Sequence, residues 1–195
     1  MSKVTIRPAR PADAPVVAAL DILAGGGVYE YIYDDRPGLP GAAPLMLQAV
    51  LSADTALSWN RVMVEELNGA PVGAVTSQPY DGQPPSGLEP SVPEDRAAHV
   101  APIQAMGRPG SWFINMIAVG AGASGNGVGR ALLGAVAEKA RSKGFSELSL
   151  RVFADNAPAI GLYRKAGFEA VERVDIPWLP RLPHRGGVVL MVQPL

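Results

Sequence analysis

Ten residues in the second half of the chain carry the strongest indication of chemistry. The segment from Gly120 to Gly129, GAGASGNGVG, contains five glycines. It lies between an apolar run, Trp112 to Val119, and an amphipathic run that ends near Lys143. A glycine-rich turn between a strand and a helix lets backbone N–H groups approach a phosphate closely. The segment therefore predicts a ligand that carries phosphate.

One glycine pattern in this segment is that of a dinucleotide-binding protein. Gly120, Gly122 and Gly125 have the GxGxxG spacing and follow a predicted strand, which is typical of an NAD(P)-dependent oxidoreductase. In that arrangement the helix begins near the second glycine, so Gly125 and the two glycines after it would lie inside a helix. Each would cost about 1 kcal/mol there. We keep this function as an alternative.

A second pattern places the helix start at about Gly127, where the glycines belong to the loop and the first helical turn. The N–H groups of six residues would then converge at a helix N-terminus and could bind a pyrophosphate. These residues are Gly125, Asn126, Gly127, Val128, Gly129 and Arg130. No Lys-Ser or Lys-Thr pair follows the glycines, which excludes a Walker loop.

Two separated motifs, taken together, resemble the GNAT superfamily of acetyl-CoA-dependent N-acetyltransferases. The first is IAV…SGNGVGRALL, and the second is NAPAIGLYRKAGFE. Family members carry a loop of the form Arg/Gln-x-x-Gly-x-Gly/Ala and a later segment Asn…Ala…Leu-Tyr-x-x-x-Gly-Phe. In this chain the later segment is Asn156, Ala159, Leu162, Tyr163, Gly167 and Phe168. The opening VTIRPARPADAPVVAAL is also similar to the start of typical members.

The resemblance implies an α/β (α+β) fold with a central mixed β-sheet flanked by helices, and acetyl-CoA as the co-substrate. Coenzyme A would lie in a V-shaped split between the strands at Trp112–Val119 and Ser146–Phe153. The backbone of Ile117, Ala118 and Val119 would pair with the pantetheine arm, and the glycine loop would hold the pyrophosphate. Asn156 would bond the pantetheine. Tyr163 would act as the general acid that protonates the leaving thiolate.

Two residues depart from the family pattern and leave the general base open. Ser124 stands where members usually carry Arg or Gln, and Arg151 stands where some carry a catalytic Glu. Arginine stays protonated and cannot act as a base. The remaining candidates are Asn115, which could orient a water, and Glu89, Glu94, Asp95, His99 and His184. The departures also admit a catalytically degenerate domain that binds or senses acyl-CoA.

The resemblance places the acceptor beside the loop between the first two helices, which here reads VYEYIYDDRPG. Tyr29, Tyr31, Tyr33 and Asp34 could form an acidic, aromatic wall for a cationic amine. The alternative is that these tyrosines pack on the core. The acceptor expected is a primary amine, either a small molecule or a peptide N-terminus.

The elements that must position these residues alternate along the chain. Strands are expected at Val4–Pro8, around the Asn68-Gly69 hairpin, at Trp112–Val119, at 146–153, at 168–176 and at the C-terminus. Helices are expected from Asp13, as the cap, to Gly25, at Ala43–Leu51, at 127–143 and at 156–166. The longest of them has an apolar stripe: Val128, Leu132, Leu133, Val136, Ala137 and Ala140. A proline-rich loop of about 79–110 interrupts one expected domain, 1–195.

Composition removes other classes of function. The chain has 195 residues, a formal net charge of −1, no cysteine and two histidines. We therefore expect no thiolate chemistry, no metal, no nucleic acid and no membrane partner. The N-terminus lacks the apolar core of a signal peptide, so we expect a cytoplasmic protein. A homodimer is possible by analogy, with the apolar C-terminal GGVVLMVQPL extending the interface.

Overall fold

The computed structural model describes residues 4–38, 40–83, 92, 94–182 and 184–195, without the side chain of Asp95. Seven strands form one sheet in the order β1-β2-β3-β4-β5-β7-β6. They are β1 (Val4–Pro8), β2 (Val62–Leu67), β3 (Ala70–Pro79), β4 (Trp112–Val119), β5 (Glu147–Phe153), β6 (Glu169–Val174) and β7 (Val188–Pro194). Neighbouring strands are antiparallel, except that β4 and β5 are parallel. The predicted mixed sheet is confirmed.

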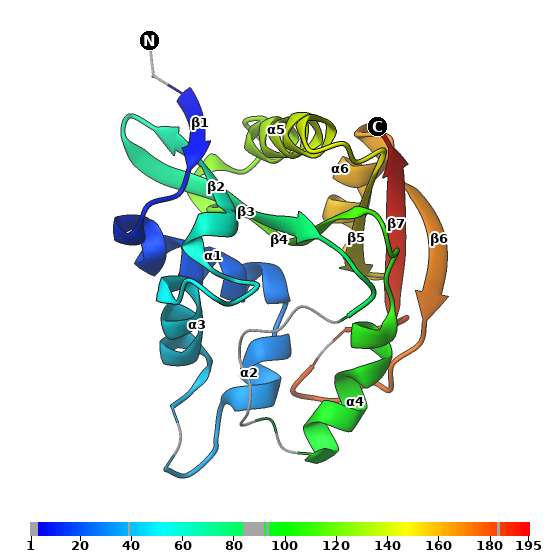
Figure 1. Ribbon diagram of the computed structural model, residues 1–195. Helices are drawn as coiled ribbons and strands as arrows, with labels where there is room; N and C mark the ends of the chain where they lie inside the picture. Colours follow the sequence, from blue (N-terminus) through cyan, green and yellow to red (C-terminus); the bar gives the residue numbers. More distant parts are fainter. Residues whose placement is uncertain (1–3, 39, 84–91, 93, 183) are drawn as a thin grey trace.

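Helices cover both faces of this sheet (Figure 1). On one face lie α1 (Ala14–Gly25), α2 (Val28–Tyr33), α3 (Ala42–Leu51) and α4 (Glu94–Ala105), and on the other lie α5 (Val128–Ser142) and α6 (Ala157–Lys165). Three short 3₁₀ turns, η1 (Pro11–Asp13), η2 (Trp59–Arg61) and η3 (Ala121–Ala123), join them. Among the described residues, no helix is both long and apolar enough to span a lipid bilayer.

Helix α5 follows its sequence pattern closely. Its buried residues are the six of the predicted apolar stripe, and they pack on the buried strand residues Leu148 and Leu150. Gly127 precedes the helix with φ +86°, and Gly144 follows it with φ +82°. Only glycine adopts such angles without strain, so these two residues set the ends of the helix.

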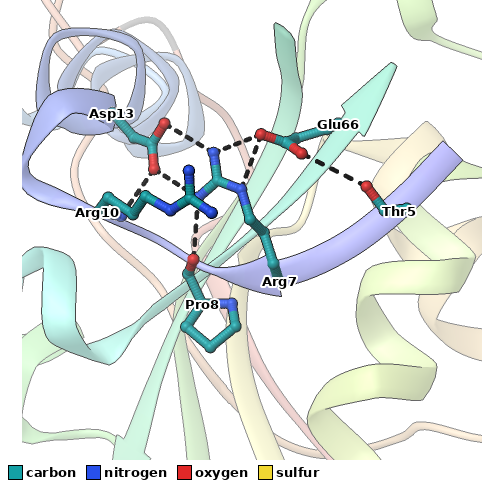
Figure 2. A network of polar contacts seen from close by, with 6 residues as sticks. All are labelled: Thr5, Arg7, Pro8, Arg10, Asp13 and Glu66. Atoms are coloured by element: carbon teal, nitrogen blue, oxygen red, sulfur yellow. Dashed lines mark hydrogen bonds and ion pairs between the residues drawn. The ribbon is translucent and has the colours of Figure 1, made fainter. Parts of the chain in front are cut away.

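A network around Arg7 joins β1, β2 and η1 (Figure 2). Arg7 donates to Glu66 at 2.7 Å and to Asp13 at 2.7 Å. The hydrogen bond from Arg7 holds the pKa of Asp13 below its usual value, although burial opposes this effect. Asp13 was expected to cap α1, but its carboxylate accepts from Arg7 and from the Arg10 N–H instead. This residue therefore secures η1 and the sheet edge rather than α1.

Two further expectations are corrected. The segment expected as a loop between the first two helices contains α2, and the segment expected as a proline-rich loop contains α4. The apolar C-terminal segment forms β7, which pairs with β5 on one side and β6 on the other. Most of its side chains are buried within this chain, and its contribution to a dimer interface stays a prediction.

Candidate functional site

The parallel strands β4 and β5 separate along their length. Their pairing covers Trp112 with Leu148, Phe113 with Ser149 and Ile114 with Leu150, and then stops. Strand β4 continues to Val119 but pairs only with β3 over that stretch. The expected split between these two strands is therefore present. It leaves one backbone edge of β4 open beyond Ile114.

A β-bulge occurs where the separation begins. Thr76 on β3 faces Met116, and the next residue, Ser77, faces Ile114, so Asn115 has no cross-strand partner. A bulge bends its strand and redirects the side chains around it. Asn115 consequently lines the space between the separated strands.

The split opens into a cavity of about 1080 Å³. The structure brings most of the predicted site residues to its walls: Tyr29, Tyr33, Asn115, Ile117, Ala118, Val119, Gly125, Gly127, Val128, Gly129, Arg130, Asn156, Tyr163 and His184. Asn126, Tyr31 and Asp34 do not line it. One hollow therefore joins the glycine loop, the open edge of β4 and the start of α6.

The glycine loop presents donors to this cavity. In the described part of the chain, the N–H groups of Gly125, Gly127, Val128, Gly129 and Arg130 make no backbone hydrogen bond. The run is interrupted at Asn126, whose N–H donates to the Ala123 carbonyl at 3.4 Å. Unbonded N–H groups at the start of a 15-residue helix favour an anion.

The first glycine of the dinucleotide pattern has a different role. The Gly120 N–H donates to the Val72 carbonyl at 2.8 Å and so extends the contact between β4 and β3. Gly120 and Gly122 do not line the cavity. The helix begins after Gly127, as the second interpretation of the glycines predicts.

Asn156 and Tyr163 lie at the two ends of α6. The Asn156 Oδ1 accepts from the Ala159 N–H at 3.2 Å and caps the helix, which leaves the amide NH₂ as a donor. Tyr163 is 6% exposed, and burial raises its pKa to about 12. Its hydroxyl makes no hydrogen bond to any residue that the structure describes.

His184 joins three parts of the cavity wall. Its Nε2 lies 2.6 Å from the Gly26 carbonyl oxygen, its Nδ1 lies 2.9 Å from Asp155 Oδ1, and its ring stacks on Phe153. Burial raises the pKa of Asp155, but the hydrogen bonds from the Arg185 N–H and His184 outweigh it and lower that pKa overall. With both nitrogens facing acceptors, His184 positions the wall and has no lone pair directed at a substrate.

The remaining candidate bases are distributed differently. Glu94 is exposed at the start of α4, and His99 packs against Tyr31 outside the cavity. Glu89 and the side chain of Asp95 lie outside the described residues. Of the candidates, Asn115 alone reaches the cavity with an uncommitted polar side chain in the described structure.

The tyrosine-rich segment contributes less to the cavity than expected. Tyr29 lines it and donates its hydroxyl to Met116 Sδ at 3.7 Å. Tyr31 instead packs against the Arg96 guanidinium at 5.6 Å, and Asp34 accepts from the Ala42 N–H at 2.8 Å. The alternative in which these tyrosines pack on the core describes Tyr31, which belongs to a buried cluster.

Sequence reasoning did not assign Arg151 to the site, although it noted the residue as a departure. Arg151 lines the cavity, with its guanidinium 4.9 Å from the centre of the Phe113 ring. Burial lowers its pKa, and contacts with Tyr80 oppose that effect. The alternation along β5 could have predicted this position. Leu148, Leu150 and Val152 face α5, so Arg151 points to the opposite face of the sheet.

Comparison with known proteins shows the family of the chain. The family model described as "Acetyltransferase (GNAT) family" matches residues 29–168, which is more than half of the chain. A curated relative, the mycothiol acetyltransferase of Saccharomonospora viridis, is 45% identical over 59 residues. The match covers 30% of this chain and only 19% of that protein.

Solved structures share the whole fold at low sequence identity. An N-acetyltransferase from Staphylococcus aureus Mu50 has a TM-score of 0.70 and 19% identity, over 96% of this chain and 99% of that one. The NatC complex bound to Gag peptide and CoA has a chain with a TM-score of 0.56 and 14% identity, over 99% of each chain. At these identities the likeness shows the fold alone.

Proposed function

The chain belongs to the GNAT family of acetyltransferases, and on that basis we propose that it moves the acetyl group of acetyl-CoA to the nitrogen of a primary amine. One observation carries the proposal. The open backbone edge of β4 and the unbonded N–H groups at the start of α5 lie in the same cavity. A single ligand with an amide-containing arm and a pyrophosphate fits both features.

The donor would be held mainly by backbone. The arm of acetyl-CoA would add to the edge at Ile117, Ala118 and Val119 as an extra strand does, by hydrogen bonds to peptide groups. The N–H groups of Gly125 and of the residues from Gly127 to Arg130 would bind the pyrophosphate. Because backbone does this work, Ser124 in place of Arg or Gln removes a side-chain contact without removing the cradle.

The transfer would be a direct attack. The lone pair of the neutral amine forms a C–N bond to the thioester carbon, and the carbonyl oxygen takes the negative charge, which a backbone N–H of β4 stabilises. The C–S bond then breaks, the hydroxyl of Tyr163 gives its proton to the thiolate, and the amine proton passes to water. Solvent restores the tyrosine proton.

The raised pKa of Tyr163 bears on this step. A phenol with a pKa of about 12 is a weaker acid than an ordinary tyrosine, which disfavours proton transfer to a thiolate. The same burial penalises the thiolate, however, and so raises the pKa of the leaving thiol too. The two shifts act in opposite directions on the transfer, and Tyr163 remains our candidate for the general acid.

The acceptor is proposed as a small amine or a peptide N-terminus. The test is to measure binding of acetyl-CoA, NADH and NADPH by thermal shift, then to follow release of free thiol with a panel of amines. Stabilisation by acetyl-CoA with amine-dependent thiol release is expected. Stabilisation without release on a broad panel would favour the sensor, and stabilisation by a nicotinamide nucleotide alone would overturn the proposal.

A further inference from the structure

The fixed charges on the cavity wall are of one sign. Among the described residues that line it, Arg130, Arg151 and Lys165 carry permanent positive charge, and none is Asp or Glu. Arg130 belongs to the first turn of α5, where the pyrophosphate is proposed, and Lys165 ends α6 on the same face of the sheet. Arg151 lies away from the proposed pyrophosphate site, so that ligand group does not explain its charge.

Arg151 lies on the opposite face of the sheet from α5 and α6. Its guanidinium rests over the Phe113 ring, and its Nη2 donates to the carbonyl oxygen of Gln104 in α4 at 3.2 Å. The cavity lining also includes the apolar residues Ile103, Phe153 and Val188, which belong to one hydrophobic cluster. The same cluster contains residues of α2 and α4, which cover that face in Figure 1.

The cation is poorly compensated there. In the described part of the chain no carboxylate pairs with Arg151, and its Nε is buried without a hydrogen-bond partner. A charge that is partly withdrawn from water, as this one is, is costly unless an opposite charge or hydrogen bonds compensate it. The carbonyl oxygen of Gln104 and the aromatic rings of Phe113 and Tyr80 compensate part of the charge. The Tyr80 ring lies 5.9 Å from the guanidinium. An anion would supply the rest.

We propose that the acceptor amine also carries a carboxylate, and that Arg151 binds it. This inference rests on the proposed function, because it concerns the second substrate of the same site. Guanidinium and carboxylate form short, charge-assisted hydrogen bonds of defined geometry. The apolar lining suits an aliphatic or aromatic side chain, so the substrate class is an apolar amino acid. A nearby cation also lowers the pKa of an ammonium group, which favours the neutral, nucleophilic amine.

The experiment compares matched amines. We would measure kcat/KM for leucine, methionine and phenylalanine, for their carboxamides, and for the amines that lack the carboxyl group, each corrected for its fraction of neutral amine. Charged hydrogen bonds of this kind give a preference of roughly 10- to 100-fold for the carboxylate. R151Q is expected to abolish that preference, whereas R151K keeps part of it. R141Q, which alters an exposed arginine of α5 outside the cavity, is the matched control.

The preference for carboxylate-bearing amines shows whether Arg151 binds substrate or only supports the fold. If Arg151 only anchors α4 through Gln104, R151Q lowers kcat/KM for all three kinds of amine equally, and the inference is wrong. If R151Q does not fold, the inference is tested by comparing the preference for carboxylates in the wild type with that in R151K. Titration of the amino acids into the protein saturated with CoA gives a second readout, and failure of all three to bind overturns the inference.

The outcomes also distinguish this inference from the function beneath it. Equal kcat/KM for charged and uncharged amines would remove the role of Arg151 and leave the acetyltransferase standing. Loss of acetyl-CoA binding and of all amine-dependent thiol release would remove both.

Discussion

Ile114 and Leu150 are the last residues that β4 and β5 pair, and beyond them the two strands diverge. The divergence creates the cavity, because it exposes one edge of β4 without disturbing its pairing with β3. The helix that starts after Gly127 then points its unbonded N–H groups at the same opening. Two backbone features thus define the proposed donor side of the site.

Tyr163 provides the most direct test of the proposed chemistry. The Y163F change removes the proton that would reach the thiolate and keeps the ring that packs against Phe168 at 5.8 Å. We expect kcat to fall about 100-fold or more, the range for loss of a general acid, with the Kd of acetyl-CoA unchanged. Steady-state kinetics and calorimetry measure the two quantities.

Tyr31 gives the matched control, since it is a buried tyrosine that does not line the cavity. Y31F should leave kcat within about twofold of the wild type, as a buried change outside the site does. If Y163F behaved as Y31F does, Tyr163 would not be the acid.

The glycine cradle can be tested by adding one methyl group. Gly127 has φ +86°, so G127A places a side chain in the left-handed region at a cost of about 1–2 kcal/mol. Relief of that strain would turn the N–H groups at the start of α5, and we expect the Kd of acetyl-CoA to rise about tenfold or more. The measurement is calorimetric titration with acetyl-CoA.

Gly134 is the control within the same helix. It is exposed, and an added Cβ would meet nothing within 4 Å. G134A should leave the Kd unchanged and stabilise the protein by about 1 kcal/mol, because alanine favours the helix. An equal loss of affinity in both variants would mean that the cradle is not the pyrophosphate site.

The elements of the fold differ in how well the sequence predicts them. Strand β4 and helix α5 have long, regular patterns. The predicted bounds of both agree with the structure, as does the predicted buried face of α5. Helix α2 has six residues, rich in aromatic and β-branched types that favour strands. It is held by tertiary contacts, since Arg96 Nη1 donates to the carbonyls of Tyr31, Ile32 and Asp34. Helix α4 contains Pro102 and lies among prolines, so its pattern indicates a loop.

For the site, the donor side was predictable and the acceptor side was not. The glycine loop, Asn156 and Tyr163 belong to contiguous motifs whose spacing is visible in the chain. The proposed acceptor end combines Gln104 of α4, Phe113 of β4 and Arg151 of β5, which come together only through the strand pairing and the placement of α4.

Asp34 distinguishes the expected acidic wall from the contacts observed. Its Oδ1 accepts the Ala42 N–H at the start of α3, and it does not line the cavity. D34A should therefore destabilise the protein by about 0.5–2 kcal/mol, as loss of a helix cap does, with no change in the acceptor KM. Urea unfolding and steady-state kinetics measure these effects. A large rise in KM at unchanged stability would restore Asp34 to the acceptor site.

The buried carboxyl group of Asp21 makes the free energy of unfolding depend on pH. It is buried in α1, with Thr76 Oγ1 3.5 Å from its Oδ1, and among the described residues its Oδ2 has no hydrogen-bond partner. Burial raises its pKa from 3.8 to about 8. Between about pH 4 and pH 8 the folded protein therefore holds a proton that the unfolded chain has already released. The contribution of Asp21 to stability falls across that window as pH rises and is lost above it.

D21N isolates this effect, because the amide is neutral at every pH and nearly equal in shape. The variant's free energy of unfolding, relative to the wild type, should increase from pH 5 to pH 9 in urea titrations, since only the wild type must ionise or retain a proton at position 21. D54N, which makes the same substitution at an exposed aspartate, is the matched control. Parallel pH profiles for D21N and the wild type would mean that Asp21 ionises in the folded protein as readily as in the unfolded chain, and that its burial is relieved by contacts with water.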